Sequence, residues 1–207
     1  MTTDVIRQIT DRIAPEYEQI FPRETTERIV VESLNTLTEQ ATVTAWLPTF
    51  AERFARDRLR ALAKNEHLFD DERPAVLFLC VHNAGRSQMA AGLLRHLSGG
   101  AIAVFSGGSE PASEINPVAV QAMAEIGIDI TNEFPKPWTN EVVGAVDVVV
   151  SMGCGDACPV LPGKRYVDWE LEDPAGKPID VVRRVRDEIG KRVGDLIAVL
   201  GVEPRSV

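Results

Sequence analysis

The sequence predicts an α/β protein built on a small, doubly wound, four-stranded parallel sheet, preceded by an N-terminal three-helix bundle. Apolar residues recur at helical spacing in the first 65 residues. After residue 74, short β-rich runs alternate with helical ones, which is the pattern of a doubly wound sheet. Between these regions, charged residues and Pro74 interrupt both patterns, as a linker does. We therefore predict two domains, residues 1–72 and residues 73–207.

Three runs of helical spacing define the N-terminal bundle. They are Val5, Ile9, Ile13 and Tyr17; then Ile29, Val30, Leu34, Leu37 and Ala41; then Leu47, Phe50, Phe54 and Leu62. Pro22 and Pro48 stand where a helix can end or begin. The bundle contains no cysteine, and no histidine precedes His67, so nothing in it suggests chemistry. We expect it to mediate homodimerisation or to cover the face of the active site.

Four strands and three helices are expected in order after the linker. The strands cover residues 75–79, 101–105, 146–151 and 164–167, and the helices cover residues 87–97, 117–126 and 179–200. The first and third strands are strongly apolar runs, which is typical of strands buried on both faces. Gly127 is expected to stop the second of these helices.

Composition and charge exclude several classes of protein. The 207 residues are 44% hydrophobic and carry a formal net charge of −9, so the chain can form a core but lacks the basic surface that nucleic acid requires. No run approaches the ~20 consecutive apolar residues of a membrane span, and charges interrupt any apolar signal sequence in the first 20 residues. We expect a cytoplasmic protein with no membrane or nucleic-acid partner. Its three cysteines are too few for a disulfide scaffold.

The strongest functional signal lies where the first strand of the sheet meets the following helix. Cys80 is followed by five residues and then by Arg86 and Ser87. In an open α/β sheet, ligands bind beyond the carboxyl ends of the strands, where loop amides and a helix N-terminus face an anion. Arg86 adds a planar fork that can grip two oxygens. The loop is therefore predicted to bind a tetrahedral oxyanion beside Cys80, whose nucleophilic thiolate form this positive field favours.

The predicted oxyanion-binding residues form one unbroken segment. They are Val81, His82, Asn83, Ala84, Gly85, Arg86 and Ser87. Asn83 tolerates the left-handed backbone that a tight curl needs, and Gly85 leaves room for close approach of the anion. The Ser87 hydroxyl is expected to donate a hydrogen bond to the Cys80 sulfur. The geometry gives no reason to aim His82 at a substrate.

Residues 76–90, VLFLCVHNAGRSQMA, resemble the active-site segment of the low-molecular-weight protein tyrosine phosphatase superfamily, and in particular its arsenate reductase branch. Residues 168–177, DWELEDPAGK, resemble the acid loop of that branch, and residues 184–189 resemble its last helix. The resemblance covers about residues 74–201. It implies a low-molecular-weight phosphatase-like fold and an arsenate reductase with an N-terminal helical extension.

The acid loop is expected to supply the general acid. A thiolate that displaces an oxygen from a tetrahedral oxyanion needs the leaving group to be protonated. Asp173 is predicted for this role because it matches the family's general acid and because Pro174 restricts it to an extended conformation. Glu172 is the less favoured substitute.

Cys154 and Cys158 follow the third strand, at the same sheet edge as Cys80. For a reductase of this branch, we expect Cys154 to attack the Cys80–arsenate adduct and Cys158 to take over the disulfide that results. Thioredoxin is the expected external reductant, a small thiol such as mycothiol is the alternative, and no bound cofactor is expected. A metal site is disfavoured because no second Cys or His pair stands at zinc-ligand spacing.

Two other functions remain open. The first is phosphomonoester or phosphotyrosine hydrolysis by Cys80, Arg86 and Asp173, with the later cysteines protecting the nucleophile from oxidation. The second is a non-enzymatic oxyanion or redox sensor that uses the helical bundle to bind partners. Only Trp169 and Trp138 are available to hold a phenyl ring near the acid loop, which favours the reductase. The sequence thus predicts an arsenate or phosphate-like oxyanion as substrate.

Overall fold

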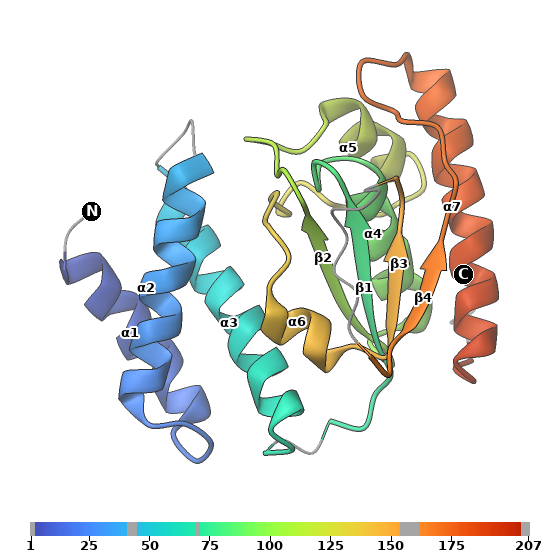
Figure 1. The fold of residues 1–207 in the computed structure, drawn as a ribbon. Helices are drawn as coiled ribbons and strands as arrows, with labels where there is room; N and C mark the ends of the chain where they lie inside the picture. Colours follow the sequence, from blue (N-terminus) through green and yellow to red (C-terminus); the bar gives the residue numbers. More distant parts are fainter. Residues whose placement is uncertain (1–2, 41–44, 69–70, 154–161, 204–207) are drawn as a thin grey trace. The chain divides into compact units, whose positions relative to one another are not determined.

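A computed structural model describes residues 3–40, 45–68, 71–153 and 162–203 of the chain. The chain divides into two compact units. The helical unit comprises Met1–Asp71 and Thr139–Ala145, and the α/β unit comprises Glu72–Trp138 and Val146–Val207. Figure 1 shows the elements of both units, coloured along the sequence.

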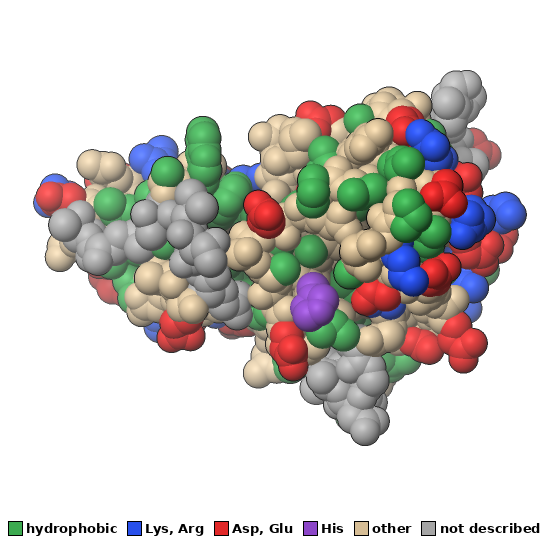
Figure 2. Space-filling model, turned by 90° about the horizontal axis from the view of Figure 1, so that it is seen from above, with side chains coloured by type: hydrophobic (Ala, Val, Ile, Leu, Met, Phe, Trp, Pro, Cys, Tyr) green, Lys and Arg blue, Asp and Glu red, His purple; other side chains and the backbone are tan. Residues whose placement is uncertain are grey.

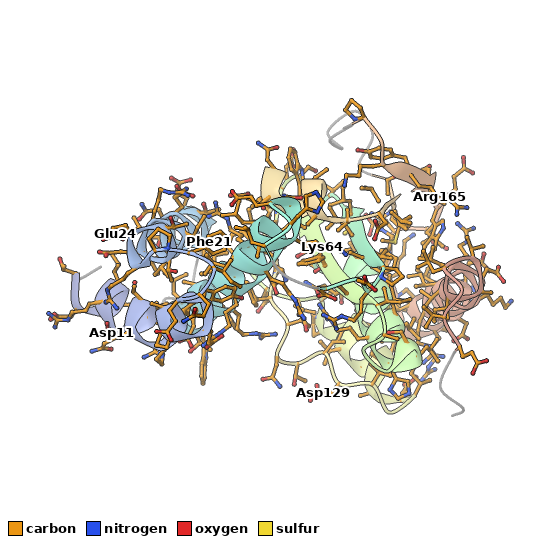
Figure 3. All side chains as sticks on the ribbon, turned by 90° about the horizontal axis from the view of Figure 1, so that it is seen from below. Asp11, Phe21, Glu24, Lys64, Asp129 and Arg165 are labelled. Carbon is orange, nitrogen blue, oxygen red and sulfur yellow. The ribbon has the colours of Figure 1, made fainter. Side chains whose placement is uncertain are left out.

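The helical unit contains three long helices and one short one. They are α1 (Thr3–Tyr17), α2 (Arg23–Gln40), α3 (Leu47–Asn65) and α6 (Asn140–Ala145). The long helices confirm the predicted bundle, and apolar positions that set the helical spacing, such as Ile13 and Phe54, are buried. Phe21 is also buried, whereas Asp11 and Glu24 are exposed, and Figure 3 labels these three side chains.

Arg58 of α3 connects the two segments of the helical unit, residues 1–71 and residues 139–145. It is buried, and its Nη2 donates hydrogen bonds to Glu32 Oε2 and to Glu141 Oε1, both at 2.7 Å. The Asn65 amide donates to the backbone oxygen of Glu141 at 2.8 Å. Gly144 leaves room for this packing, because a Cβ there would lie 2.8 Å from Asn65 Nδ2 and would displace the Asn65 side chain. Helix α6, which was not predicted from the sequence, is therefore held against α3 by hydrogen bonds and close packing.

The α/β unit contains one four-stranded, fully parallel sheet with the order β2-β1-β3-β4. The strands are β1 (Ala75–Cys80), β2 (Ala103–Gly108), β3 (Val148–Ser151) and β4 (Arg165–Asp168). The predicted doubly wound fold is confirmed. All six residues of the central strand β1 are buried, and Arg165, labelled in Figure 3, is exposed on the edge strand β4. Because β2 and β3 flank β1 on opposite sides, the chain reverses direction across the sheet at the end of β1, where ligands bind in such folds.

In the described part of the α/β unit, three helices cover the core. They are α4 (Arg86–Ser98), α5 (Pro117–Ala124) and α7 (Ile179–Val199), and both α4 and α5 pack against α7. Val76, Phe78 and Cys80 alternate along β1 and belong to the same core cluster as Met89 of α4 and Ile189 of α7. The period of two in β1 therefore turns Cys80 toward the helices. Among the described residues, no helix is long and apolar enough to cross a membrane.

Candidate active site

The oxyanion loop, residues 80–87, connects the end of β1 to the start of α4. Cys80 is the last residue of β1 and is only 3% exposed. Its Sγ lies 2.9 Å from the Ser87 hydroxyl oxygen, which provides the expected hydrogen bond. Ser87 is fully buried in the first turn of α4. The sulfur therefore lies at a helix N-terminus, next to a hydroxyl that can stabilise the thiolate.

Asn83 holds the curl of the oxyanion loop. Its φ is +46°, so the predicted left-handed conformation is confirmed. Its Nδ2 donates to Ser87 Oγ at 2.9 Å, and its Oδ1 accepts from the backbone N–H of Lys136 at 3.0 Å and from Gln88 Nε2 at 3.1 Å. Gln88 and Lys136, whose hydrogen bonds to Asn83 stabilise the loop, were not identified from the sequence. Since Asn83 is fully buried, these bonds stabilise the conformation of the loop.

A second segment, residues 109–116, runs beside the oxyanion loop. The backbone N–H groups of Glu110, Ala112 and Asn116 donate to carbonyl oxygens of the loop, each at 2.9 Å. The acceptors are Val81, His82 and Ala84. His82 Nδ1 lies 3.0 Å from the Glu110 carbonyl oxygen, so the His82 side chain forms a hydrogen bond with the neighbouring segment.

Arg86 connects the oxyanion loop to the acid loop, residues 168–177. Its Nη2 donates to Asp173 Oδ2 at 3.1 Å, and its Nη1 donates to the Leu171 carbonyl oxygen at 3.4 Å. Arg86 is 8% exposed, whereas the Asp173 side chain is 52% exposed. A Cβ at Gly85 would lie 3.1 Å from Pro174 Cγ, so the two loops are in close contact. The structure thus brings together Cys80, Arg86 and Asp173.

Glu172, the alternative acid, has a different environment from that of Asp173. Its carboxylate lies 3.4 Å from Lys177 Nζ, and both side chains are about half exposed. It does not line the hollow beside Cys80, whereas Asp173 does. The geometry favours Asp173 as the acid.

The hollow beside Cys80 has a volume of about 200 Å³. Its described lining includes Ala84, Ala112 and Ile115 together with Arg86 and Asp173, and no aromatic ring other than that of His82. The Trp169 ring is buried and packs on Phe78 at a centroid distance of 5.7 Å, and Trp138 is not among the lining residues. Figure 2 views the molecule from the side toward which the strands of Figure 1 point. The site suits a small oxyanion better than an aryl ester.

Cys154 and Cys158 lie outside the described residues. The chain reaches them from the same sheet edge that carries Cys80, because Ser151 at the end of β3 pairs with Leu79. Across the described part of the chain, no three Cys, His, Asp or Glu side chains gather as metal ligands.

The fold and the site define a class of protein: a parallel α/β protein in which one loop, between a buried strand and a helix N-terminus, carries both a buried cysteine and a buried arginine. Residues 75–205 match the model of the low molecular weight phosphotyrosine protein phosphatase family, and residues 6–63 match that of the protein-tyrosine-phosphatase-like N-terminal domain. The chain belongs to the low molecular weight phosphotyrosine protein phosphatase family.

Similar proteins place the chain near arsenate reductases, as its sequence suggests. It is 42% identical over 126 residues to the glutaredoxin arsenate reductase of Synechocystis sp., a match that covers 59% of this chain and 95% of the relative. Arsenate reductase 2 of Staphylococcus haemolyticus is 41% identical over 57% of this chain and 92% of its own length. The structure of a thioredoxin-dependent arsenate reductase of Corynebacterium glutamicum, Cg_ArsC1', matches with a TM-score of 0.87 at 43% identity, covering 97% and 98% of the two chains.

Proposed function

We propose that this chain reduces arsenate to arsenite through an adduct on Cys80 and a disulfide relay of Cys80, Cys154 and Cys158. The observation that carries the proposal is the hollow beside Cys80, which is small and is lined by the Arg86 guanidinium, and whose described lining residues include no aromatic ring other than that of His82. The thioredoxin-dependent reductase that matches almost the whole chain supports the same activity.

Oxyanion binding begins with the exchange of partners at Arg86. In the structure the guanidinium donates to Asp173. Arsenate offers two oxygens to the same fork, and the amides of residues 81–87 surround it in this proposal. Once arsenate has replaced it at Arg86, the Asp173 carboxyl is free to serve as the general acid.

The first chemical step forms the Cys80–arsenic bond. The Cys80 thiolate attacks arsenic, one As–O bond breaks, and Asp173 donates its proton so that the oxygen leaves as water. Arsenic remains As(V) in this thioester-like adduct. The Ser87 hydroxyl, 2.9 Å from Sγ, stabilises the thiolate before the attack.

The relay supplies the two electrons. The Cys154 thiolate attacks the Cys80 sulfur, the electron pair of the S–As bond passes to arsenic, and arsenite leaves as As(III). The Cys158 thiolate next attacks Cys154, releasing the Cys80 thiolate and leaving a Cys154–Cys158 disulfide. We infer that thioredoxin reduces this disulfide, with mycothiol as the alternative reductant, and that the enzyme works in the cytoplasm.

A second candidate function is hydrolysis of phosphomonoesters. Cys80, Arg86 and Asp173 are sufficient for it, and the family model that matches residues 75–205 is that of phosphatases. Among the described lining residues, only His82 has an aromatic ring, which argues against aryl esters as the main substrates.

The test measures arsenate-dependent NADPH oxidation with thioredoxin and thioredoxin reductase, in parallel with hydrolysis of an aryl phosphate. We expect wild type to turn over arsenate, Cys158→Ser to release one equivalent of arsenite and stop with a Cys80–Cys154 disulfide, and Cys154→Ser to release none. Full turnover by Cys154→Ser with thioredoxin would exclude the relay. Rapid hydrolysis with no arsenate turnover would assign the chain to the phosphatases.

A further inference from the structure

Gly153, immediately after β3 and Met152, lies against the guanidinium of Arg86. Its φ is +79°, in the left-handed region that favours glycine. A Cβ at this position would lie 3.0 Å from Arg86 Nη1 and 3.9 Å from Cζ. The backbone at residue 153 therefore occupies one side of the fork that the proposed function assigns to the anion.

The backbone before Gly153 is held on both sides by the sheet. The Met152 N–H donates to the Leu79 carbonyl oxygen at 2.8 Å, and the Met152 side chain is fully buried. On the other side, the Trp169 N–H donates to the Ser151 carbonyl oxygen at 2.8 Å. A new side chain at residue 153 is therefore accommodated by movement of the Arg86 guanidinium rather than by withdrawal of the strand.

The Arg86 guanidinium can move away from a Cβ at residue 153 only by losing hydrogen bonds. Nη1, the nitrogen nearest Gly153, donates to the Leu171 carbonyl oxygen, and Nη2 donates to Asp173. The side chain is almost completely buried, so a rotation of the fork changes which nitrogens face the hollow beside Cys80. Bidentate recognition of an oxyanion depends on that orientation.

We propose that Gly153 is a positioning residue for oxyanion binding, because the absence of a side chain there sets the orientation of the Arg86 fork. This inference rests on the proposed function only in assigning Arg86 to the anion. Gly153 directly precedes Cys154 in the sequence. The residue that orients the Arg86 guanidinium is therefore adjacent in sequence to the first of the two proposed relay thiols.

The experiment compares Gly153→Ala with Gly127→Ala in the full chain, using inorganic phosphate as the probe and isothermal titration calorimetry as the measurement. Gly127 has a φ of +76°, and a Cβ there would meet nothing within 4 Å among the described residues. Both variants carry the same backbone penalty, but only Gly153→Ala reaches Arg86. We expect Gly153→Ala to weaken phosphate binding about tenfold and Gly127→Ala to change it less than twofold.

A second variant separates folding from positioning. Asparagine tolerates left-handed backbone, so Gly153→Asn reduces the strain while keeping a Cβ against Nη1. We expect it to melt near the wild-type temperature and to show the same loss of phosphate affinity, with a parallel rise in the KM for arsenate. Phosphate affinity within twofold of wild type in either folded variant overturns the proposal, as does equal weakening in Gly127→Ala or a wild type that binds no phosphate. Phosphate binding without arsenate turnover overturns the proposed function alone.

Discussion

Two buried arginines, Arg58 in the helical unit and Arg86 in the α/β unit, have almost the same exposure but different surroundings. Arg58 donates to two carboxylates at 2.7 Å and to the Ser33 hydroxyl at 3.3 Å, and its Cζ lies 5.8 Å from the centre of the Phe54 ring. Within the described part of the chain, Arg86 has one carboxylate partner, at 3.1 Å, and it lines the hollow beside Cys80.

The difference shows how to distinguish a structural arginine from one available to a ligand. The Arg58 guanidinium is enclosed by groups of its own unit, so the pairing contributes to the stability of that unit. The carboxylate that pairs with Arg86 is half exposed and belongs to a loop, so breaking this pair costs less than breaking a fully buried one. Burial of a charged group thus indicates function only when its partner can be exchanged.

The largest expected effect is on turnover, from Arg86→Lys. Lysine keeps the charge but loses the two-pronged donor, so we expect kcat/KM for arsenate to fall about 10³-fold. Steady-state arsenate reduction provides the measurement. Arg95→Lys, on the same helix and paired with Glu133, is the control and should remain within twofold of wild type. Similar losses in both variants would remove the distinction that we draw for Arg86.

Replacing the exchangeable partner should have the next largest effect. Asp173→Asn retains an oxygen for Arg86 but has no proton to give to the leaving group, so we expect kcat to fall about 10²-fold with a smaller change in phosphate affinity. Glu172→Gln is the matched control, since this neighbouring carboxylate pairs with Lys177 instead. If Glu172→Gln caused the larger loss of kcat, the acid would be Glu172.

For Arg58 we expect a loss of stability with little loss of turnover. Arg58→Met keeps most of the buried volume but leaves Glu32 and Glu141 without their shared cation, which lowers the free energy of unfolding by about 2 kcal/mol. Urea denaturation followed by circular dichroism provides the measurement. Arg28→Met removes only an exposed pair with Glu32 and should cost less than about 0.5 kcal/mol.

The smallest predicted effect is a pH dependence at Glu141. Burial raises the pKa of this carboxyl, but the hydrogen bond and charge of Arg58, together with hydrogen bonds from the Glu141 backbone and the Thr139 side chain, outweigh the effect of burial and hold the pKa below its ordinary value of 4.5. The ion pair therefore adds stability that is fully present above pH 4.5 and is lost as the pH falls through the lower folded-state value.

Glu141→Gln should accordingly be about 1 kcal/mol less stable than wild type at pH 7, and this difference should shrink below pH 4.5. Urea denaturation at a series of pH values checks it, with the exposed Glu24→Gln as the control. A difference that grows on acidification would show that the charge of Glu141 does not stabilise the native state.

The parts of the fold with strong local patterns were predictable from the sequence. The buried run of β1 and the Cys-x5-Arg-Ser spacing located the oxyanion loop, and α4 begins one residue before its predicted start. Strand β2 begins two residues later than predicted and extends through Gly107 and Gly108. A Cβ at either glycine would lie within 3.0 Å of backbone atoms, so these weak strand formers are required by tertiary packing that no local pattern reveals.

Other features depend on contacts between distant residues. Asn83 was expected to curl the loop, but its bonds to Lys136, 53 positions away, follow from the packing of the whole unit. Helix α6 has only six residues, too few for a helical period to stand out. The domain boundary near residue 72 remains a prediction, and so do the catalytic roles of Cys80, Arg86, Asp173, Cys154 and Cys158.

The attachment of α6 to α3 limits how relatives of this chain can be recombined. Residues 139–145 lie far along the sequence from the N-terminal helices, yet they carry the carboxylate that faces Arg58 and the glycine that accommodates Asn65. A chimera that exchanges only residues 1–71 between two relatives would join a foreign α3 to the original α6. Successful exchange requires both segments to be inherited together, so we expect substitutions in α3 and α6 to be correlated across the family.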